Sequence, residues 1–436
     1  MDEARIGDRP APLGSELPAG ARFAGEILGS PGWVGEDHPT RDDLSSCVAC
    51  GLCLPHCPTY RLTAEESASP RGRIAAMRAV ADGAAQVDDV FAGFMDLCLV
   101  CCACEDVCPS HVPFGRMMEA ARTQVEPTRS RRARFARWLG LDIAWPHKKL
   151  LWLAALFQPV AMPFMPRRVR TLTPRPSERF HRLPTVVEPP SHVEARGTVA
   201  VLSGCVQDRW FRDVNRATIE VLASNGSRVT VPRGQRCCGA LPAHNGRLDT
   251  ARRLAAHNAA IFAEAEHVVV NSAGCGAHMQ TYDDLLQGPG LPAVDVMVFL
   301  DREGIVREPA ALPGVDRVAY HDACHALRAQ HIHDEPRRIL GQIPGLEVIE
   351  IANGDRCCGA AGLYNVTEPE MSGRLRAEKA EAVRDTGAHV IASANPGCTM
   401  QIAAGMRELG VEVEVVHPVE LLARAYAAAN STDAER

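Results

Sequence analysis

The chain has 436 residues, 46% of them apolar and 23% charged, which is the composition of a folded protein long enough for several domains. Its 53 acidic and 47 basic side chains leave a formal charge of −6, which argues against a nucleic-acid binder with its strongly basic domain. No apolar run is long enough to span a bilayer, and the first residues lack the pattern of a secretory signal. We therefore expect a cytoplasmic protein, whose 17 cysteines indicate metal or redox chemistry rather than disulfides.

The cysteines divide the chain into parts. Nine lie between Cys47 and Cys108, none lies between Cys108 and Cys205, and eight lie between Cys205 and Cys398. Gly, Pro and charged residues dominate the beginning of the chain, which is typical of a loosely ordered arm. The expected segments are a flexible arm (1–40), a helical cysteine-rich domain (41–125), a basic and apolar connector (126–195), and two α/β domains (196–312 and 313–436).

The first group of cysteines repeats one spacing. The run from Cys47 to Pro58 reads C-x2-C-x2-C-x3-C-P, and the run from Cys98 to Pro109 repeats it. In two-cluster ferredoxins, three cysteines of one run and the fourth of the other hold each [4Fe–4S] cluster. The expected ligands are Cys47, Cys50, Cys53 and Cys108 for cluster 1, and Cys98, Cys101, Cys104 and Cys57 for cluster 2. Two zinc sites are the alternative, because four thiolates also bind zinc.

The residues between these runs favour helices. Helical patterns at 71–80 and 90–97 replace the shorter β-rich insert of a small bacterial ferredoxin. The segment thus resembles the all-α two-cluster ferredoxin domain of succinate and fumarate enzymes. Cys102 has no place in the repeat, and we interpret it as a small buried hydrophobic residue, with a ligand or redox thiol as the alternative.

The connector is basic and then apolar. Residues 129–182 carry 13 Lys or Arg against two acids, and they enclose an apolar run at 150–165. Pro159 and Pro163 interrupt this run, so it is not expected to form a straight spanning helix. One interpretation is a helical linker that packs on the first cysteine-rich domain or on a partner subunit. The other is contact with a membrane surface, since cations and tryptophans flank the apolar residues.

The second half of the chain is an internal repeat. Its cysteines fall in two matching sets: Cys205, Cys237, Cys238 and Cys275, then Cys324, Cys357, Cys358 and Cys398. The gaps are 31 and 36 residues in the first copy and 32 and 39 in the second, and each adjacent pair continues as Cys-Cys-Gly. We refer to the two halves as CCG copies. Duplication is the simplest explanation.

Each copy alternates strands with helices. β-branched runs at 198–201, 227–231 and 267–271 match runs at 317–320, 347–351 and 389–393. This alternation predicts parallel sheets, and the cysteines follow the carboxyl ends of the strands, where open α/β sheets place ligands. The eight cysteines are therefore candidate ligands of a metal or cluster, with buried small hydrophobes as the alternative. Nearby histidines could supply a nitrogen ligand or remain in the core: His244, His278, His321 and His325.

Glycine after each cysteine pair has a conformational role. It lets the chain turn sharply, so that neighbouring thiols that would diverge in a strand can face one site.

Two ferredoxin-type runs followed by two CCG copies resemble the iron–sulphur subunit of bacterial glycolate oxidase over nearly all of residues 44–422. The resemblance implies an α+β multidomain fold, with an all-α two-cluster ferredoxin domain before two α/β CCG repeats with parallel sheets. It also implies two [4Fe–4S] clusters in this chain, FAD in partner subunits that oxidise glycolate to glyoxylate, and a quinone-type acceptor. Each CCG copy departs from heterodisulfide reductase, where a closing C-x-x-C supplies a fifth thiolate.

This chain should then be an electron conduit, since it carries no dinucleotide fingerprint, phosphate loop or Ser-His-Asp signature. The expected location is the cytoplasm, with the inner face of the cell membrane as a peripheral contact. Three alternatives stay open. They are a disulfide or heterodisulfide reductase, the iron–sulphur subunit of a glycerol-3-phosphate or lactate dehydrogenase, and a zinc-stabilised scaffold without redox activity.

Overall fold

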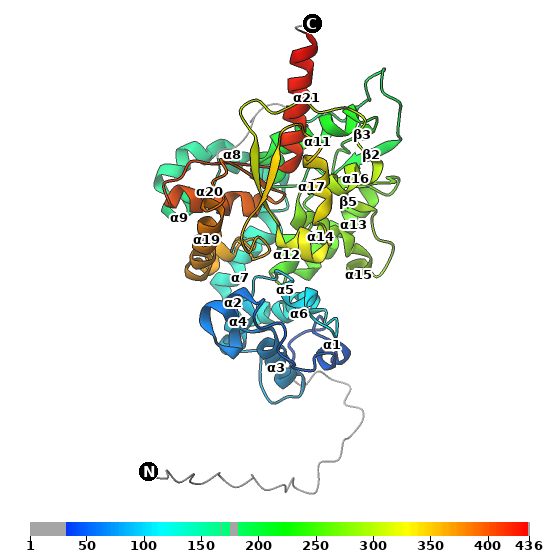
Figure 1. Cartoon of the computed structure of the whole chain (residues 1–436). Coiled ribbons are helices and arrows are strands. Elements are labelled where there is room, and N and C mark those ends of the chain that lie inside the picture. The colour runs from blue at the N-terminus through cyan, green and yellow to red at the C-terminus, as the bar shows by residue number, and fades with distance from the viewer. Residues whose placement is uncertain (1–31, 166, 175–181, 435–436) are drawn as a thin grey trace, which may run out of the picture.

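The computed structural model describes residues 32–165, 167–174 and 182–434 (Figure 1). Residues 1–31 of the expected arm lie outside the described residues. Short helices occupy one end of the molecule, and two α/β units occupy the rest (Figure 1). The mixed fold with a helical first domain is confirmed, since the strands of the described residues all begin at Val186 or later.

The first domain, which we call the ferredoxin domain, is built from short capped helices. They are α1 (Arg41–Ser45), α2 (Pro58–Thr63), α3 (Pro70–Ala81), α4 (Asp89–Asp96), α5 (Ala103–Asp106) and α6 (Phe114–Val125). The two helices expected between the cysteine runs are α3 and α4. Ser69 caps α3 through the amide of Gly72, and Asp88 caps α4 through the amide of Phe91. The cysteine runs occupy the loops around α2 and α5.

The first CCG copy has the expected strands at nearly the expected residues. They are β2 (Thr198–Val201), β3 (Arg228–Thr230), β4 (Val268–Val270) and β5 (Ala293–Asp295). The helices around them include α10 (Gln207–Trp210), α11 (Arg212–Ser224), α12 (Ala240–His244), α13 (Leu248–Ile261), α14 (Ala273–Gln280), α15 (Tyr282–Leu286) and α16 (Val296–Glu303). The sheet order is β1-β3-β2-β4-β5, and only β1 (Val186–Val187) is antiparallel within it. This edge strand is a difference from the expected parallel sheet.

The second CCG copy repeats the same order. Its strands are β6 (Arg317–His321), β7 (Glu347–Glu350), β8 (Val390–Ser393) and β9 (Glu414–Val416), in an all-parallel sheet ordered β7-β6-β8-β9. The surrounding helices are η5 (His325–Ala329), α17 (Asp334–Leu340), α18 (Tyr364–Thr367), α19 (Pro369–Arg384), α20 (Pro396–Glu408) and α21 (Pro418–Ala434). In both sheets the first long strand lies between the second and the third, so crossovers leave it in opposite directions. That reversal opens a crevice at the carboxyl ends of the strands.

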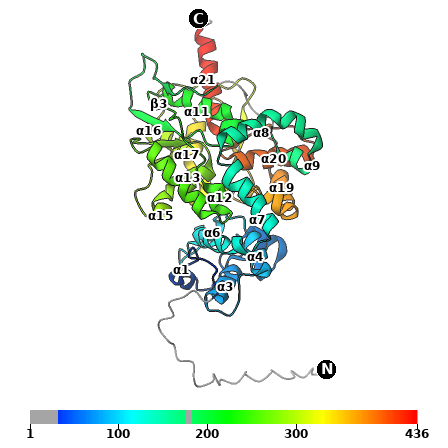
Figure 2. The same cartoon turned by 180° about the vertical axis from the view of Figure 1, so that it is seen from behind.

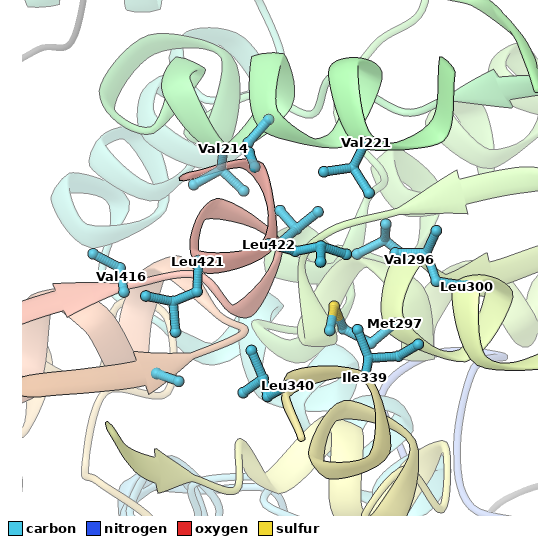
Figure 3. Close-up of a cluster of buried hydrophobic side chains, with 14 of the residues drawn as sticks. Val214, Val221, Val296, Met297, Leu300, Ile339, Leu340, Val416, Leu421 and Leu422 are labelled. Carbon is cyan, nitrogen blue, oxygen red and sulfur yellow. The ribbon is translucent and has the colours of Figure 1, made fainter. Parts of the chain in front are cut away.

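One hydrophobic core joins the two copies. Helix α21 of the second copy packs on α11 of the first, with Leu421 and Leu422 fully buried between them (Figure 3). The other labelled members of this core come from α11, α16, α17 and β9: Val214, Val221, Val296, Met297, Leu300, Ile339, Leu340 and Val416. Because the copies share this core, their crevices are held in a fixed relation to each other.

The connector forms α7 (Arg131–Arg137), the π-helical turn η3 (Trp138–Ala144), α8 (Lys148–Ala161), η4 (Met162–Phe164) and α9 (Arg167–Leu172). Helix α8 packs on the first CCG copy and α9 on α20 of the second, away from the helices of the ferredoxin domain (Figure 2). The expectation that this helical linker packs on the ferredoxin domain is wrong for α8 and α9. The described residues contain no helix that is both long and apolar enough to cross a membrane.

The expected break at Pro159 is also wrong, because α8 continues through that residue to Ala161. A proline inside a helix removes one backbone hydrogen bond. Here the buried face of α8, with Leu151, holds the helix on the first copy, and Trp210 Nε1 donates to Gln158 Oε1 at 2.7 Å beside the proline. Tertiary contacts therefore override the local preference.

Candidate metal centres

The two ferredoxin-type loops have the same backbone shape. Ala49 and Gly51 have positive φ values of 56° and 86° in the first loop, and Val100 and Cys102 have 50° and 59° in the second. These pairs occupy equivalent positions between the first three cysteines of each run. Alternation of right-handed and left-handed residues turns successive backbone amides toward one point, which creates an anion-binding concavity found at iron–sulphur sites. Both loops therefore fit a negatively charged cluster.

The four cysteines expected for cluster 2 line one cavity. Cys57, from the first run, faces it together with Cys98, Cys101 and Cys104 from the second. The backbone brings Cys57 there because Pro58 begins α2 directly after it. Without metal, burial raises the pKa of the Cys101 thiol, with a further contribution from Cys324. A bound cation would reverse that preference, because metal ligation requires thiolates.

The cysteines expected for cluster 1 are more accessible. Cys50 is exposed, and Cys47, Cys53 and Cys108 are half-buried. Cys47 and Cys108 pack against the same hydrophobic core, although 60 residues separate them in the sequence. Arg78 supports the loop by donating to the carbonyl of Cys47 at 2.5 Å.

Cys102 occupies the position that Gly51 has in the first loop. It is half-buried, not fully buried as the sequence interpretation had it, and its left-handed backbone begins α5. The thiol lies 3.9 Å from the carbonyl oxygen of Val100. Its position follows from the loop geometry.

In the first CCG copy, the four thiols gather beyond the ends of β2, β3 and β4. The Sγ atoms of Cys205 and Cys237 are 3.4 Å apart, and those of Cys238 and Cys275 are 3.2 Å apart. Hydrogen bonds from Cys205 and Cys238 lower the pKa of the Cys237 thiol well below its ordinary value. A thiolate in a group of close thiols is the arrangement that soft metal ions bind.

The second copy gathers its thiols in the same way. Hydrogen bonds link Cys324 to Cys357, Cys357 to Cys358, and Cys358 to Cys398. His321, the last residue of β6, joins Cys358 and Cys398, with the three ligand atoms within 4.8 Å of one another. The two copies thus bring together residues that lie more than thirty positions apart in the sequence.

The glycine after each cysteine pair adopts the expected left-handed turn. The φ values are 96° for Gly239 and 82° for Gly359. A Cβ atom at Gly359 would lie 2.8 Å from the carbonyl oxygen of Ser372. Any side chain at this position would therefore displace the loop that presents Cys357 and Cys358.

Sequence reasoning missed two buried lysines. Lys148 of α8 donates to Ser203 Oγ at 2.7 Å beside Cys205 and Cys237, and Lys379 of α19 donates to the carbonyl of Gly354 at 2.9 Å beside the thiols of the second copy. Burial lowers the pKa of both ammonium groups. A cation close to several thiols favours the thiolate forms that bind metals. Neither lysine belongs to a motif, so no signal in the single sequence marked them.

Four histidines near the CCG motifs have two different placements. His278 and His321 are buried in the first and second copy, and burial lowers the pKa of His278 to about 4. His244 and His325 meet where the two copies contact the ferredoxin domain, with ring centroids 5.2 Å apart. His244 Nδ1 lies 2.6 Å from Glu119 of α6, and His325 Nε2 lies 2.8 Å from the carbonyl oxygen of Val100.

The cluster 2 cavity adjoins the second CCG site. Leu99, Cys101 and Ala103 pack with Cys357 and with side chains of α18 and α19 in one hydrophobic cluster, against which Cys324 also packs. Two polar contacts close the same interface. Tyr364 Oη donates to the carbonyl of Leu97 at 3.0 Å, and an ion pair joins Arg328 to Asp106. The ferredoxin domain and the second copy are therefore in direct contact at their cysteines.

The comparisons with known proteins follow the same division. Residues 43–112 match the 4Fe-4S dicluster domain family, and residues 199–280 and 318–403 each match the CCG cysteine-rich domain family. The chain is 35% identical over 420 residues to the probable glycolate oxidase iron-sulfur subunit of Bacillus subtilis (strain 168), covering 88% of this chain and 94% of that protein. It belongs to the family of glycolate oxidase iron-sulfur subunits. The Escherichia coli (strain K12) member is 30% identical over 399 residues, with 88% and 94% of the two chains covered.

A relative outside the glycolate oxidase family matches along nearly the whole chain. This component of the fumarate reductase (CoM/CoB) of Methanothermobacter marburgensis is 27% identical over 434 residues, covering 98% of this chain and 80% of that protein. Among solved structures, glutamate racemase RacE1 of Bacillus anthracis covers 56% of this chain and 84% of its own at 10% identity, with a TM-score of 0.27. This likeness is too low to bear on fold or activity. The two CCG matches confirm the internal duplication.

Proposed function

We propose that this chain carries electrons for a complex whose FAD-bearing partner oxidises glycolate to glyoxylate. The observation that carries the proposal is the contact between the cluster 2 cavity and the second CCG site, where Cys101 and Cys357 pack in one hydrophobic cluster. Two thiolate sites in direct contact form a relay. A two-electron flavin needs such a relay of one-electron centres to unload stepwise.

The proposed ligands are the two crossed sets of ferredoxin cysteines. Cys47, Cys50, Cys53 and Cys108 would hold cluster 1, and Cys98, Cys101, Cys104 and Cys57 would hold cluster 2. The shared cavity of the second set and the matched backbone of the two loops support this assignment. When bound, each [4Fe–4S] cluster accepts and releases one electron. The chain's own contribution is to direct backbone amides at the clusters and to keep water from cluster 2.

The exposure of the two sites suggests a direction for the electrons. Cluster 1 would lie beside the exposed Cys50, where a partner flavoprotein can approach. Cluster 2 would lie between cluster 1 and the second CCG copy. The CCG cysteines, with lysines nearby, would accept a further cluster or metal.

The acceptor side is proposed at the connector, with a quinone as the acceptor. Helix α8 buries Leu151 against the first CCG site and exposes an apolar face: Leu150, Leu153, Phe157, Val160 and then Phe164 of η4. No acidic side chain lies on α8 or η4. Such a face would rest on the anionic inner surface of the cell membrane, where quinones are dissolved. The protein would then be a cytoplasmic, peripheral subunit.

Glycolate-dependent reduction tests the main proposal. The anaerobically purified chain is mixed with the flavoprotein subunits, and the visible absorbance of its clusters is followed after glycolate is added. We expect bleaching only when the flavoprotein is present. Flavin bound to this chain alone together with glycolate turnover, or no visible absorbance and no iron after anaerobic purification, would refute the conduit. The second of these results would favour the zinc scaffold.

Substrate identity needs its own assay, since no residue of this chain need touch the hydroxy acid. The reconstituted complex is tested on glycolate, D-lactate and glycerol-3-phosphate. Preference for glycolate is expected. A complex that oxidises glycerol-3-phosphate and ignores glycolate would contradict the proposed substrate.

Membrane contact is tested by flotation with vesicles that contain anionic phospholipid. A Phe157→Ser, Phe164→Ser variant removes two of the most exposed apolar side chains of the connector, and Val366→Ser changes an exposed apolar residue of α18 as the control. We expect the double variant to lose flotation and the control to keep it. Equal flotation of both variants would refute contact through the connector.

One cavity favours a second candidate function, the reduction of a disulfide. A space of about 280 Å³ lies between the ferredoxin domain and the second CCG copy, lined by Cys101, Cys324, Cys357, Arg328 and Arg356 among others. It would admit a small anionic disulfide to the thiols. Disulfide reduction by the isolated chain, lost in Cys358→Ser with folding intact, would favour this function over the conduit.

A further inference from the structure

The second CCG site differs from the first by one buried imidazole. His321 ends β6, three residues before Cys324, and only 1% of its surface is exposed. Leu202 stands at the equivalent position three residues before Cys205, and it is buried as well. The duplicated fold therefore places a nitrogen donor in one copy and an aliphatic side chain in the other.

His321 has no hydrogen-bond partner at either ring nitrogen in the described residues. A buried imidazole without partners is costly, because it loses its bonds to water and gains none from the protein. Its ligand atom lies within 4.8 Å of the Sγ atoms of Cys358 and Cys398, and all three residues are buried. A metal ion at the centre of this triangle would satisfy the imidazole.

The spacing of these atoms favours one ion over a cube of irons. Ligand atoms that share a tetrahedral ion lie about 2.0–2.3 Å from it, and so lie within about 4 Å of one another. Thiolates of a [4Fe–4S] cluster bind different irons and are spread around the cube. The converging triangle of His321, Cys358 and Cys398 matches the first arrangement after a small contraction.

We propose that His321, Cys358 and Cys398 bind a single divalent transition-metal ion in the second CCG copy, and that the first copy lacks an equivalent site. Two thiolates and one imidazole suit zinc or ferrous iron. Cys357, hydrogen-bonded to Cys358, is within reach of the fourth tetrahedral position. Ser393, the neighbour of His321 in the pairing of β6 with β8, has a buried unpaired hydroxyl that can accept from the second imidazole nitrogen. Such an outer partner is usual for metal-bound histidine.

The site is independent of the proposed electron transfer, and the zinc absorption edge tests it without interference from iron. The full anaerobic chain, with its ferredoxin clusters, is stripped of weakly held metal and titrated with Zn²⁺ alone. We expect one tightly bound zinc per chain, with sulphur at about 2.3 Å and nitrogen at about 2.0 Å in its X-ray absorption. A shell with sulphur alone would overturn the assignment of His321.

His321→Leu should remove the nitrogen shell and weaken zinc binding at least about tenfold. His417→Leu is the matched control, since His417 is another buried histidine of the second copy with one unpaired nitrogen. His321→Gln keeps a polar side chain of similar length and serves as the second variant if the leucine variant fails to fold. The ferredoxin cluster signal in electron paramagnetic resonance reports folding in each variant. Equal zinc affinity in the His321 and His417 variants would overturn the proposal.

Metal content of the untreated chain identifies the natural ion. About eight irons belong to the two ferredoxin clusters. One zinc, or one iron beyond the eight without extra sulfide, would support a single ion in the second copy. Four or more further irons with matching sulfide that persist in His321→Leu would overturn it, while leaving the electron conduit intact.

Discussion

Arg122 offers a sharp test of how the ferredoxin domain is held on the first CCG copy. It lies on α6 and is 9% exposed, and its guanidinium donates to the carbonyls of Met95 at 2.8 Å, Cys98 at 2.5 Å and His244 at 2.6 Å. Two of these acceptors belong to the loop that begins cluster 2, and the third belongs to the CCG copy. One cation therefore holds both sides of the interface.

Arg122→Met keeps much of the apolar stem and removes every donor. Each charge-assisted hydrogen bond contributes about 1.5–3 kcal/mol, but relief from burying the guanidinium offsets part of the loss. Burial opposes the charge, since it lowers the pKa of Arg122. The net destabilisation should resemble the loss of one partner of a buried ion pair, about 3–5 kcal/mol. That free energy corresponds to a fall of about 10 °C in the thermal midpoint.

Arg116→Met is the matched control on the same helix. The Arg116 side chain is 60% exposed and pairs with Asp43 at 2.7 Å, so its loss should cost under about 1 kcal/mol. Differential scanning calorimetry measures both variants, and electron paramagnetic resonance reports cluster 2 before heating. The Arg122 variant should also perturb the cluster 2 signal through Cys98. If the two variants had equal midpoints and unchanged spectra, the proposed role of Arg122 would be refuted.

Three further predictions concern the clusters, the pH dependence and the core. Cys57→Ser and Cys108→Ser should each lower the iron content from about eight to about four per chain, with Cys57→Ser removing the signal that depends on Cys98; loss of the Cys47-dependent signal in Cys57→Ser would refute crossed ligation. Burial raises the pKa of Asp295 to about 6 from 3.8, so its ionisation destabilises the fold as the pH rises between those values. Asp295→Asn should therefore gain stability relative to the unchanged chain by about 1.4 kcal/mol more at about pH 7.5 than at about pH 5, measured by thermal midpoints, and a pH-independent difference would contradict the cause. Leu422→Ala, at a fully buried position shared by the two copies, should cost about 2–5 kcal/mol in denaturant unfolding, against under about 0.5 kcal/mol for the exposed Leu409→Ala; equal losses would contradict the shared core.

Short-range patterns determined much of this protein. Cysteine spacing indicated the two cluster loops, β-branched runs predicted six of the strands to within one or two residues, and duplication of Cys-Cys-Gly predicted two similar α/β units. These features are local or periodic, so a single sequence displays them directly. Glycine after each cysteine pair was also readable, because only a left-handed turn presents adjacent thiols to one site.

Other features depend on which surfaces meet, and only the tertiary structure decided them. Lys148 reaches the first CCG site from the connector, where nothing in its own segment marks it as a neighbour of Cys205. Helix α8 continues through Pro159 because its buried face packs on the first copy, which outweighs one lost backbone bond. His321 was one of four histidines near the motifs, and its difference from the others lies in its burial beside Cys358 without a hydrogen-bond partner. Burial and pairing arise from long-range packing, which neither composition nor spacing encodes.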